Sequence, residues 1–437
     1  MKILSAKHVL PISAEPIVNG AVVIDGGRIV FVGDLADAVA KFPSAEVEDF
    51  GDAAILPGFV NCHSHIELTS MRGALDSVEH DFTSWLLRIN ELRSALTDAD
   101  IEAAAIAGAL EGAAAGVTCF GDIGRYGTAG VRALKQVGLR GIVYQETEFS
   151  PDNRTADEDF TKLGTKFEEL KNEETDLVRI GISPHSPYTV SSRLFELIAQ
   201  YSILNRVPLT IHAAESKDEM ALLTKGEGFF TTVYDRFGLE WQSPLCSPIE
   251  YLEKLGVLSA RPLLAHCVHV SETDIQRIAS NGATIAHCPK SNAKFGHGWA
   301  PFEKFLGAGI SVGLGSDSVA SNNICDILEE SRFAVLAARN RVDCGSPHEV
   351  RANASRSFIT AKQALETATL GGAKALGLDH LIGTLEPRKQ ADIAVVSLDH
   401  QAQQPVTDIE AALIFSSNGR DVQTTIVAGN CIYQRPA

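Results

Sequence analysis

The feature that most constrains the fold of this chain is a repeated alternation of short apolar segments with longer amphipathic segments. Helical periodicity is clear over residues 98–115 and 191–205, each of which lies between two apolar runs. This alternation predicts parallel strands joined by helices, in a closed (β/α)8 barrel or an open doubly wound sheet. No Gly-x-Gly-x-x-Gly motif follows the first strand, so the barrel is favoured. The predicted strands cover residues 56–63, 116–122, 140–146, 178–185, 207–212, 262–266, 283–287 and 310–317.

Both ends of the chain have a different pattern, which predicts β structure. Residues 21–25 and 28–33 are apolar, β-branched segments on either side of the turn signal Gly26-Gly27. Residues 391–396 and 424–429 repeat this character near the other end of the chain. We therefore expect the two ends to form one small β domain.

Two further helices are expected between the barrel strands and the last β segments. They cover residues 323–340 and 361–376, and they would close the barrel and lead the chain back to the β domain. The predicted organisation is thus a discontinuous β domain formed by residues 1–55 and 385–437, and an α/β barrel domain over residues 56–384.

Composition narrows the class of partner. The 437 residues include 38 basic and 55 acidic side chains, and the net charge of −17 argues against a nucleic acid polymer. Eight cysteines are scattered singly, without a Cys-x-x-Cys pair, which is typical of reduced thiols. The N-terminal segment lacks the apolar core of a secretory signal, and no apolar run is long enough to span a bilayer. We predict a cytoplasmic protein with a small-molecule partner and no membrane association.

Side chains that can bind a metal ion stand at the ends of four predicted barrel strands. His63 and His65 end the first strand, where alternate residues share a face. His212 ends the fifth strand, His266 the sixth and Asp317 the eighth. Because all carboxyl ends of barrel strands meet on one face, these side chains are expected to converge there. The pattern predicts a metal site more readily than a set of packing residues.

Glu215 follows His212 by three residues, just beyond the fifth strand. A carboxylate at this place can reach a metal-bound water and transfer its proton to a leaving group. The alternative is an exposed glutamate that stabilises a helix start. Its position beside His212 favours the catalytic interpretation.

Several motifs occur together and in a consistent order, and they carry a resemblance. They are PGFVNCHSH (57–65), ISPHSPYTVS (182–191), HAAE (212–215), AHC (265–267), HCPKSN (287–292), GLGSDSVASNN (313–323) and IGTLEPRKQADIAVV (382–396). The chain resembles the amidohydrolase superfamily, in its cytosine-deaminase-like and adenosylhomocysteine (methylthioadenosine) deaminase-like branch. The resemblance covers nearly the whole chain and implies that the β domain is the split β-sandwich of that branch.

The resemblance implies a mononuclear metal site with His63, His65, His212 and Asp317 as ligands and hydroxide as the remaining one. In this scheme His266 contacts the hydroxide, Glu215 shuttles the proton, and Asp317 also helps to deprotonate the water. Binuclear relatives need a lysine at the end of the fourth strand, where this chain has Ser183-Pro184-His185. Three nitrogens and an oxygen suit Zn²⁺ best, and Fe²⁺ accepts the same donors.

The activity implied is hydrolytic deamination, in which metal-bound hydroxide attacks an amino-bearing aromatic carbon and ammonia leaves. The leading substrates are purine nucleosides or related amino-heteroaryl compounds, such as adenosine-type thio-nucleosides or aminodeoxyfutalosine. Alternatives are a guanine-, pterin- or cytosine-type free-base deaminase, a triazine-type chlorohydrolase or amidohydrolase, and a noncatalytic metal-binding scaffold. The resemblance also allows a homodimer.

Substrate contacts are expected from a second set of residues. His185 and Trp85 match positions that line the pocket in the adenosyl-substrate deaminases, and those relatives bind ribose hydroxyls with a glutamate further along the helix. Ser94 occupies that position here and Glu91 is the nearest carboxylate, so ribose recognition is absent or arranged differently. Further substrate-binding candidates are Glu67, which resembles a residue of aminodeoxyfutalosine deaminases, Arg72 for an anionic substituent, and Asn292 of the HCPKSN motif.

Overall fold

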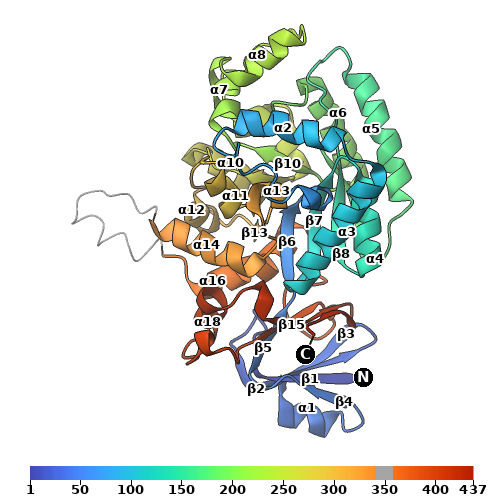
Figure 1. Ribbon diagram of the computed structural model, residues 1–437, viewed down its shortest axis with the longest axis vertical. Helices are drawn as coiled ribbons and strands as arrows, with labels where there is room; N and C mark the ends of the chain where they lie inside the picture. Colours follow the sequence, from blue (N-terminus) through green and yellow to red (C-terminus); the bar gives the residue numbers. More distant parts are fainter. Residues whose placement is uncertain (341–357, 437) are drawn as a thin grey trace, which may run out of the picture.

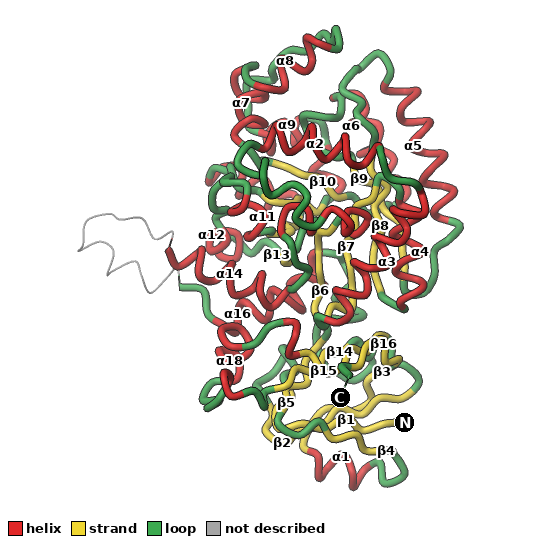
Figure 2. The backbone as a smooth tube through the Cα atoms, in the orientation of Figure 1, coloured by secondary structure: helices red, strands yellow, loops and turns green. Residues whose placement is uncertain are grey.

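The middle of the chain forms a barrel of parallel strands, which Figures 1 and 2 show above a smaller β domain. The structure is a computed structural model and describes residues 1–340 and 358–436. The barrel strands are hydrogen-bonded in the order β10-β11-β12-β13-β6-β7-β8-β9, and the parallel bridge between Ile182 and Leu209 closes the circle. Their bounds are β6 Phe59–Ser64, β7 Val117–Gly124, β8 Arg140–Glu146, β9 Val178–Ser183, β10 Thr210–Ala213, β11 Leu263–His266, β12 Thr284–His287 and β13 Val312–Leu314. The predicted (β/α)8 barrel is confirmed.

Helices surround the barrel and follow most of its strands (Figure 2). Helix α3, Asp98–Ala114, begins with a capping box formed by Thr97 and Asp100, and the chain turns at Gly116, whose φ is 82°, before it enters β7. The other helices between β6 and β13 are η1 Ile66–Met71, α2 Phe82–Ser94, α4 Gly127–Val137, α5 Ala156–Lys171, α6 Ser192–Asn205, α7 Lys217–Lys225, α8 Phe229–Arg236, α9 Pro248–Lys254, η2 Val257–Ala260, α10 Glu272–Asn281, α11 Pro289–Lys294 and α12 Phe302–Gly307.

The helices after the barrel differ in detail from the sequence prediction. The helix predicted over 323–340 begins later, at Ile327, as α14 Ile327–Asn340. Asn323 adopts a left-handed φ of 70° and ends the short helix α13 Val319–Asn322 that precedes it. The helix predicted over 361–376 changes to π-helical geometry in the middle. It consists of α16 Ala361–Glu366, the π-helical turn η3 Thr367–Gly371 and α17 Gly372–Ala375.

A second sheet contains strands from both ends of the chain, as predicted for the sandwich domain. Its order is β16-β15-β14-β5-β1-β2-β3, and β4 pairs with β1. The turn between β2 and β3 uses positive φ angles at Gly26 and Gly27, in accord with the predicted hairpin. The predicted boundary between residues 55 and 56 lies inside β5, which continues to Pro57. The elements are β1 Lys2–Val9, β2 Ile17–Asp25, β3 Arg28–Asp34, α1 Leu35–Lys41, β4 Glu46–Asp49, β5 Ala53–Pro57, β14 Ile393–Ser397, η4 Gln401–Gln403, α18 Ile409–Ser416, η5 Gly419–Asp421, β15 Val422–Val427 and β16 Asn430–Gln434.

A buried ion pair joins the barrel to the β domain. Arg140, the first residue of β8, donates from Nε and Nη2 to the two carboxylate oxygens of Asp392, at 2.8 and 3.1 Å. Asp392 also accepts a hydrogen bond from the backbone N–H of Ala428. Both charged side chains are almost fully buried, so each depends on the other for its compensating charge.

None of the helices in the described part of the chain is long and apolar enough to cross a membrane.

Replacing Asp392 with asparagine should lower the free energy of unfolding by about 3 kcal/mol, because Arg140 would keep a buried charge without a counter-charge. Chemical denaturation measures this change. Glu158→Gln is the matched control, since it removes an exposed ion pair with Lys162 on the surface of α5. Equal stabilities for both variants would show that the Arg140–Asp392 pair does not hold the two parts together.

Candidate active site

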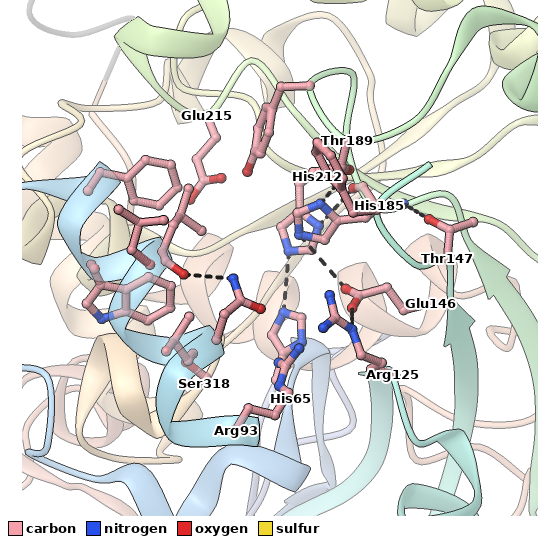
Figure 3. A pocket seen from close by; sticks show the side chains of 18 of the residues that line it. His65, Arg93, Arg125, Glu146, Thr147, His185, Thr189, His212, Glu215 and Ser318 are labelled. Carbon is pink, nitrogen blue, oxygen red and sulfur yellow. Dashed lines mark hydrogen bonds and ion pairs between the residues drawn. The ribbon is translucent and has the colours of Figure 1, made fainter. Parts of the chain in front are cut away.

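A cavity of about 700 Å³ lies at the carboxyl ends of the barrel strands (Figure 3). One side is formed by His65, His212, His266 and Asp317, which come from the ends of four different strands. The other sides come mainly from α2, α8 and the loops after β8 and β9. The aromatic lining consists of Phe82, Trp85, Tyr126, Phe149, Tyr188, Phe229, Phe230, Phe237 and Phe295. The cavity is therefore polar at the strand ends and apolar around its mouth.

Three imidazoles converge beside this cavity. Nε2 of His65 lies 3.3 Å from Nε2 of His212, and the donor atoms of these two residues and His63 all lie within 4.8 Å of one another. The buried Nε2 of His63 has no hydrogen-bond partner within the described ranges. Burial lowers the pKa of all three imidazoles, for His212 to about 4, so each is neutral at pH 7 and offers a lone pair. This donor set fits a divalent metal ion.

Asp317 completes the donor set. Its Oδ1 lies 3.5 Å from Nε2 of His63 and 3.6 Å from Nε2 of His65, while its Oδ2 accepts hydrogen bonds from the hydroxyls of Ser291 and Ser321. Burial would raise the pKa of Asp317, but its interactions with His63 and the neighbouring imidazoles hold that pKa well below its ordinary value. The carboxylate is thus ionised and fixed in orientation by hydroxyl donors.

The backbone is strained at the ends of three strands that contribute to the cavity. Ala214 after β10, His266 and Cys267 at the end of β11, and Asp317 after β13 all have φ between 47° and 71°. Left-handed conformations of residues other than glycine cost about 1–3 kcal/mol each and concentrate at functional sites. Here they turn the chain where Glu215, His266 and Asp317 line the cavity.

Glu215 lies beside two further imidazoles. Its Oε1 is 3.7 Å from Nε2 of His266 and 3.6 Å from Nε2 of His297. Burial would raise the pKa of Glu215, but the attraction of His266 and His297 holds that pKa at about 2. The carboxylate is therefore ionised at neutral pH and able to accept a proton.

His266 is fixed by its other ring nitrogen. Its Nδ1 lies 2.8 Å from Oδ1 of Asn292, so this nitrogen is the donor and Nε2 remains free toward Glu215. Asn292 was predicted to contact substrate. The structure places it behind His266 and outside the cavity lining, where it orients the imidazole.

The strand-end cluster has the composition of a metal-assisted hydrolytic site, and comparison with known proteins identifies its family. The model of the amidohydrolase family matches residues 54–432. The chain belongs to the amidohydrolase family. The resemblance inferred from the motifs is thereby confirmed.

Individual relatives of this amidohydrolase match it over nearly its whole length. A 5-methylthioadenosine/S-adenosylhomocysteine deaminase of Moorella thermoacetica is 32% identical, over 98% of this chain and 92% of the relative. A zinc-bound adenosine deaminase of Xanthomonas campestris has 27% identity and a TM-score of 0.80, with 98% of this chain and 92% of that chain covered. Aminofutalosine deaminase of Helicobacter pylori, in complex with methylthio-coformycin, has 25% identity and a TM-score of 0.79, with 99% and 100% covered.

Two of the predicted substrate contacts of the amidohydrolase line the cavity. Trp85 of α2 packs edge-on against Phe295, with ring centroids 4.9 Å apart, and forms part of the aromatic wall. His185 lies beside His212, with ring centroids 4.7 Å apart, and its Nδ1 interacts with the hydroxyls of Ser186 and Thr189. These contacts leave the Nε2 edge of His185 on the cavity side (Figure 3).

The other two predicted contacts lie outside the cavity lining. The buried carboxylate of Glu67 accepts hydrogen bonds from the backbone N–H groups of Arg125 and Tyr126, at 3.2 and 3.0 Å. The guanidinium of Arg72 pairs with Glu111 and donates to the carbonyl of Asn323. Both side chains are therefore used in contacts within the protein.

Sequence reasoning missed several charged or titratable residues in or beside the cavity. Glu146 ends the third barrel strand, so the strand-end rule that selected His212 could also have selected it. Arg93 follows Trp85 at helical spacing, on the same face of α2. Arg125 and His297 lie in loops, where no periodic signal marks a residue as facing the cavity.

Glu219 holds the turn that presents Glu215. Its Oε1 accepts a hydrogen bond from the backbone N–H of Ala214 at 2.9 Å, and its Oε2 accepts one from the N–H of Glu215 at 2.8 Å. The side chain is fully buried, and burial raises its pKa to about 8. Glu219 therefore holds both residues of the strained turn in place through their backbone N–H groups.

Glu219→Ala should lower the free energy of unfolding by about 1–3 kcal/mol, because two buried N–H groups would lose their acceptor. It should also reduce turnover, since the turn that carries Glu215 would be released. Denaturant unfolding and a steady-state assay measure the two effects. Glu227→Ala, an exposed change near the end of the same helix, is the control and should leave both unchanged. Unaltered stability of Glu219→Ala would contradict this role.

Proposed function

We propose that this amidohydrolase is a metal-dependent hydrolytic deaminase that releases ammonia from an adenosine-type nucleoside. The observation that carries the proposal is the ionised carboxylate of Glu215 beside His266, at the edge of the converging His63, His65 and His212. Deaminases of such nucleosides among its relatives support this choice of substrate class. A cavity of about 700 Å³ also has room for a nucleoside.

We propose His63, His65, His212 and Asp317 as the ligands of one divalent metal ion. The unpartnered, buried Nε2 of His63 and the converging neutral imidazoles support this assignment. Three nitrogens and one carboxylate oxygen suit Zn²⁺, the ion bound to the Xanthomonas relative, and Fe²⁺ takes the same donors. When bound, the ion supplies Lewis acidity that makes water a nucleophile at neutral pH.

The residues of the chain provide the proton transfers. Asp317 and His266, which both line the polar side of the cavity, would accept hydrogen bonds from the water. Glu215 accepts a proton and delivers it to the ring nitrogen of the substrate, then assists the departing amine. A C–O bond forms, the C–N bond breaks, and one water is consumed for each ammonia released. Trp85 and Phe295 flank the ring and exclude bulk water.

We propose a cytoplasmic location for the enzyme. The described cysteines, which leave out Cys344, are all free, and six of them are buried. Buried free thiols are typical of proteins from reducing compartments. The homodimer and the division into two folding domains stay predictions, and light scattering and limited proteolysis would test them.

Glu215→Gln should reduce the turnover number by about 10²–10⁴-fold while bound metal is retained, because the amide cannot accept the proton. Ammonia release from 5′-methylthioadenosine or adenosine measures turnover, and elemental analysis measures the metal. The exposed Glu227→Gln serves as the matched control and should behave as the wild type. Ammonia release by Glu215→Gln at the wild-type rate would refute the assigned proton transfer.

His63→Ala should reduce bound metal well below one equivalent per chain, because one of the converging donors is removed. The metal content is measured by elemental analysis after exhaustive dialysis. His380→Ala, which changes an exposed histidine far from the cluster in sequence, should retain the full content. If His63→Ala also retained it, His63 would not be a ligand.

A further inference from the structure

Three charged side chains form a corner of the cavity that the proposed chemistry does not use. They are Arg93 from α2, Arg125 from the loop after β7 and Glu146 from the end of β8, and all three line the cavity. Figure 3 shows Glu146 and Arg125 on the opposite side of His212 from Glu215. We call this group the charged corner.

The carboxylate of Glu146 lacks hydrogen-bond donors. Its Oε2 lies 3.8 Å from Nε of Arg125 and its Oε1 lies 3.9 Å from Nε2 of His185, both beyond hydrogen-bond distance. No other contact with the described residues supplies a donor, although the side chain is only 5% exposed. A buried carboxylate without donors is costly, so this acceptor is suited to a ligand that brings its own hydroxyl groups.

The guanidinium groups of Arg93 and Arg125 also lack hydrogen-bond acceptors among the described residues. Nη2 of Arg93 lies 3.7 Å from Oε1 of Glu67, whose carboxylate already accepts two backbone N–H groups. Within residues 1–340 and 358–436, neither Arg93 nor Arg125 donates a side-chain hydrogen bond, and the Nε atoms of both are buried without a partner. The charged corner therefore presents donors and an acceptor together.

The charge balance selects the kind of group that would bind. Arg93 and Arg125 contribute two positive charges, and Glu67 and Glu146 contribute two negative charges. The balance favours a neutral group that both donates and accepts hydrogen bonds over an additional anion. A vicinal diol is such a group, because its two hydroxyls can donate to one carboxylate and accept from a guanidinium. Carboxylates bind ribose hydroxyls in this way in dinucleotide-binding proteins.

The place of the corner fits a sugar attached to a ring held at the metal cluster. His185 is near both Glu146 and His212: its Nε2 lies 3.9 Å from Oε1 of Glu146, and its ring centroid lies 4.7 Å from that of His212. The carboxylate on α2 that is nearest in sequence to Ser94 cannot serve instead. Glu91 is 68% exposed, pairs with Arg88 and does not line the cavity.

Resting on the proposed function, we propose that Glu146 binds the 2′- and 3′-hydroxyls of the substrate ribose, with Arg93 and Arg125 donating to the same oxygens. The substrate class is then a ribonucleoside with a free cis-diol. A free base would leave the buried carboxylate without donors, and a deoxynucleoside would supply only one of the two.

The test compares ammonia release from adenosine, 2′-deoxyadenosine and 3′-deoxyadenosine by the metal-loaded enzyme. The wild type should prefer adenosine over each deoxynucleoside by about 10- to 100-fold in kcat/KM, the effect of one hydrogen bond to a charged group. Glu146→Gln should lose most of this preference by slowing adenosine, while its rate on the deoxynucleosides changes little. The matched control Glu91→Gln should keep the full preference.

A binding measurement gives a readout independent of turnover. Calorimetry on the same proteins should show inosine binding more tightly than 2′-deoxyinosine to the wild type, with the difference abolished in Glu146→Gln. Retained metal content of Glu146→Gln shows that the site is intact.

The outcomes separate this proposal from the proposed function. If no adenine nucleoside releases ammonia, the proposed function is wrong. If adenosine and the deoxynucleosides are deaminated equally, or if Glu91→Gln removes the preference, the diol assignment is wrong and the deaminase assignment stands. Strong preference for an adenosine analogue with a 5′-carboxylate, regardless of its diol, would assign the arginines to an anion and also overturn the proposal.

Discussion

The candidate site depends on the seam where the last barrel strand meets the first. At this seam β13 pairs with β6, and the backbone N–H of Asp317 donates to the carbonyl of His63 at 2.9 Å. The side chain of Asn61 reinforces it with hydrogen bonds to the N–H and the hydroxyl of Ser316. Gly315 permits the close approach, since a Cβ there would lie 2.6 Å from Cβ of His63. Closing the barrel is thus the same event as bringing two proposed ligands together.

The same region contains several locally unfavourable features. Left-handed residues and buried charges at the strand ends are unfavourable by themselves, and they persist because the surrounding structure determines them. Hydroxyls of Ser291 and Ser321 orient Asp317, and Asn292 orients His266. The fold is therefore less stable than it could be, but the groups that bind the metal ion and transfer protons are already fixed in orientation. This reduces the reorganisation needed during the reaction.

The sequence was sufficient to place the site residues at strand ends. It was not sufficient to predict which way side chains on helices and loops point. His63, His212 and the other strand-end residues could be placed because alternation and strand polarity fix where their side chains point. Glu67 and Arg72 follow the strand that carries His63, but their side chains contact other protein groups and do not line the cavity. The charged corner combines a helix, a loop and a strand end, so its assembly depends on tertiary packing that no local pattern records. The π-helical turn inside the helix predicted over 361–376 had no local signal either.

Two carboxylates four residues apart illustrate how environment assigns chemical roles. Glu215 and Glu219 are both fully buried, yet the pKa of Glu215 is held at about 2 and that of Glu219 is raised to about 8. The difference arises because burial and the negative charge of Glu215 raise the pKa of Glu219 despite its backbone N–H donors, whereas two imidazoles offset the effect of burial on Glu215. Separating two titratable groups in this way is how an enzyme distributes acid and base functions. Here it leaves Glu215 ionised as the proton acceptor and gives Glu219 the task of holding it in place.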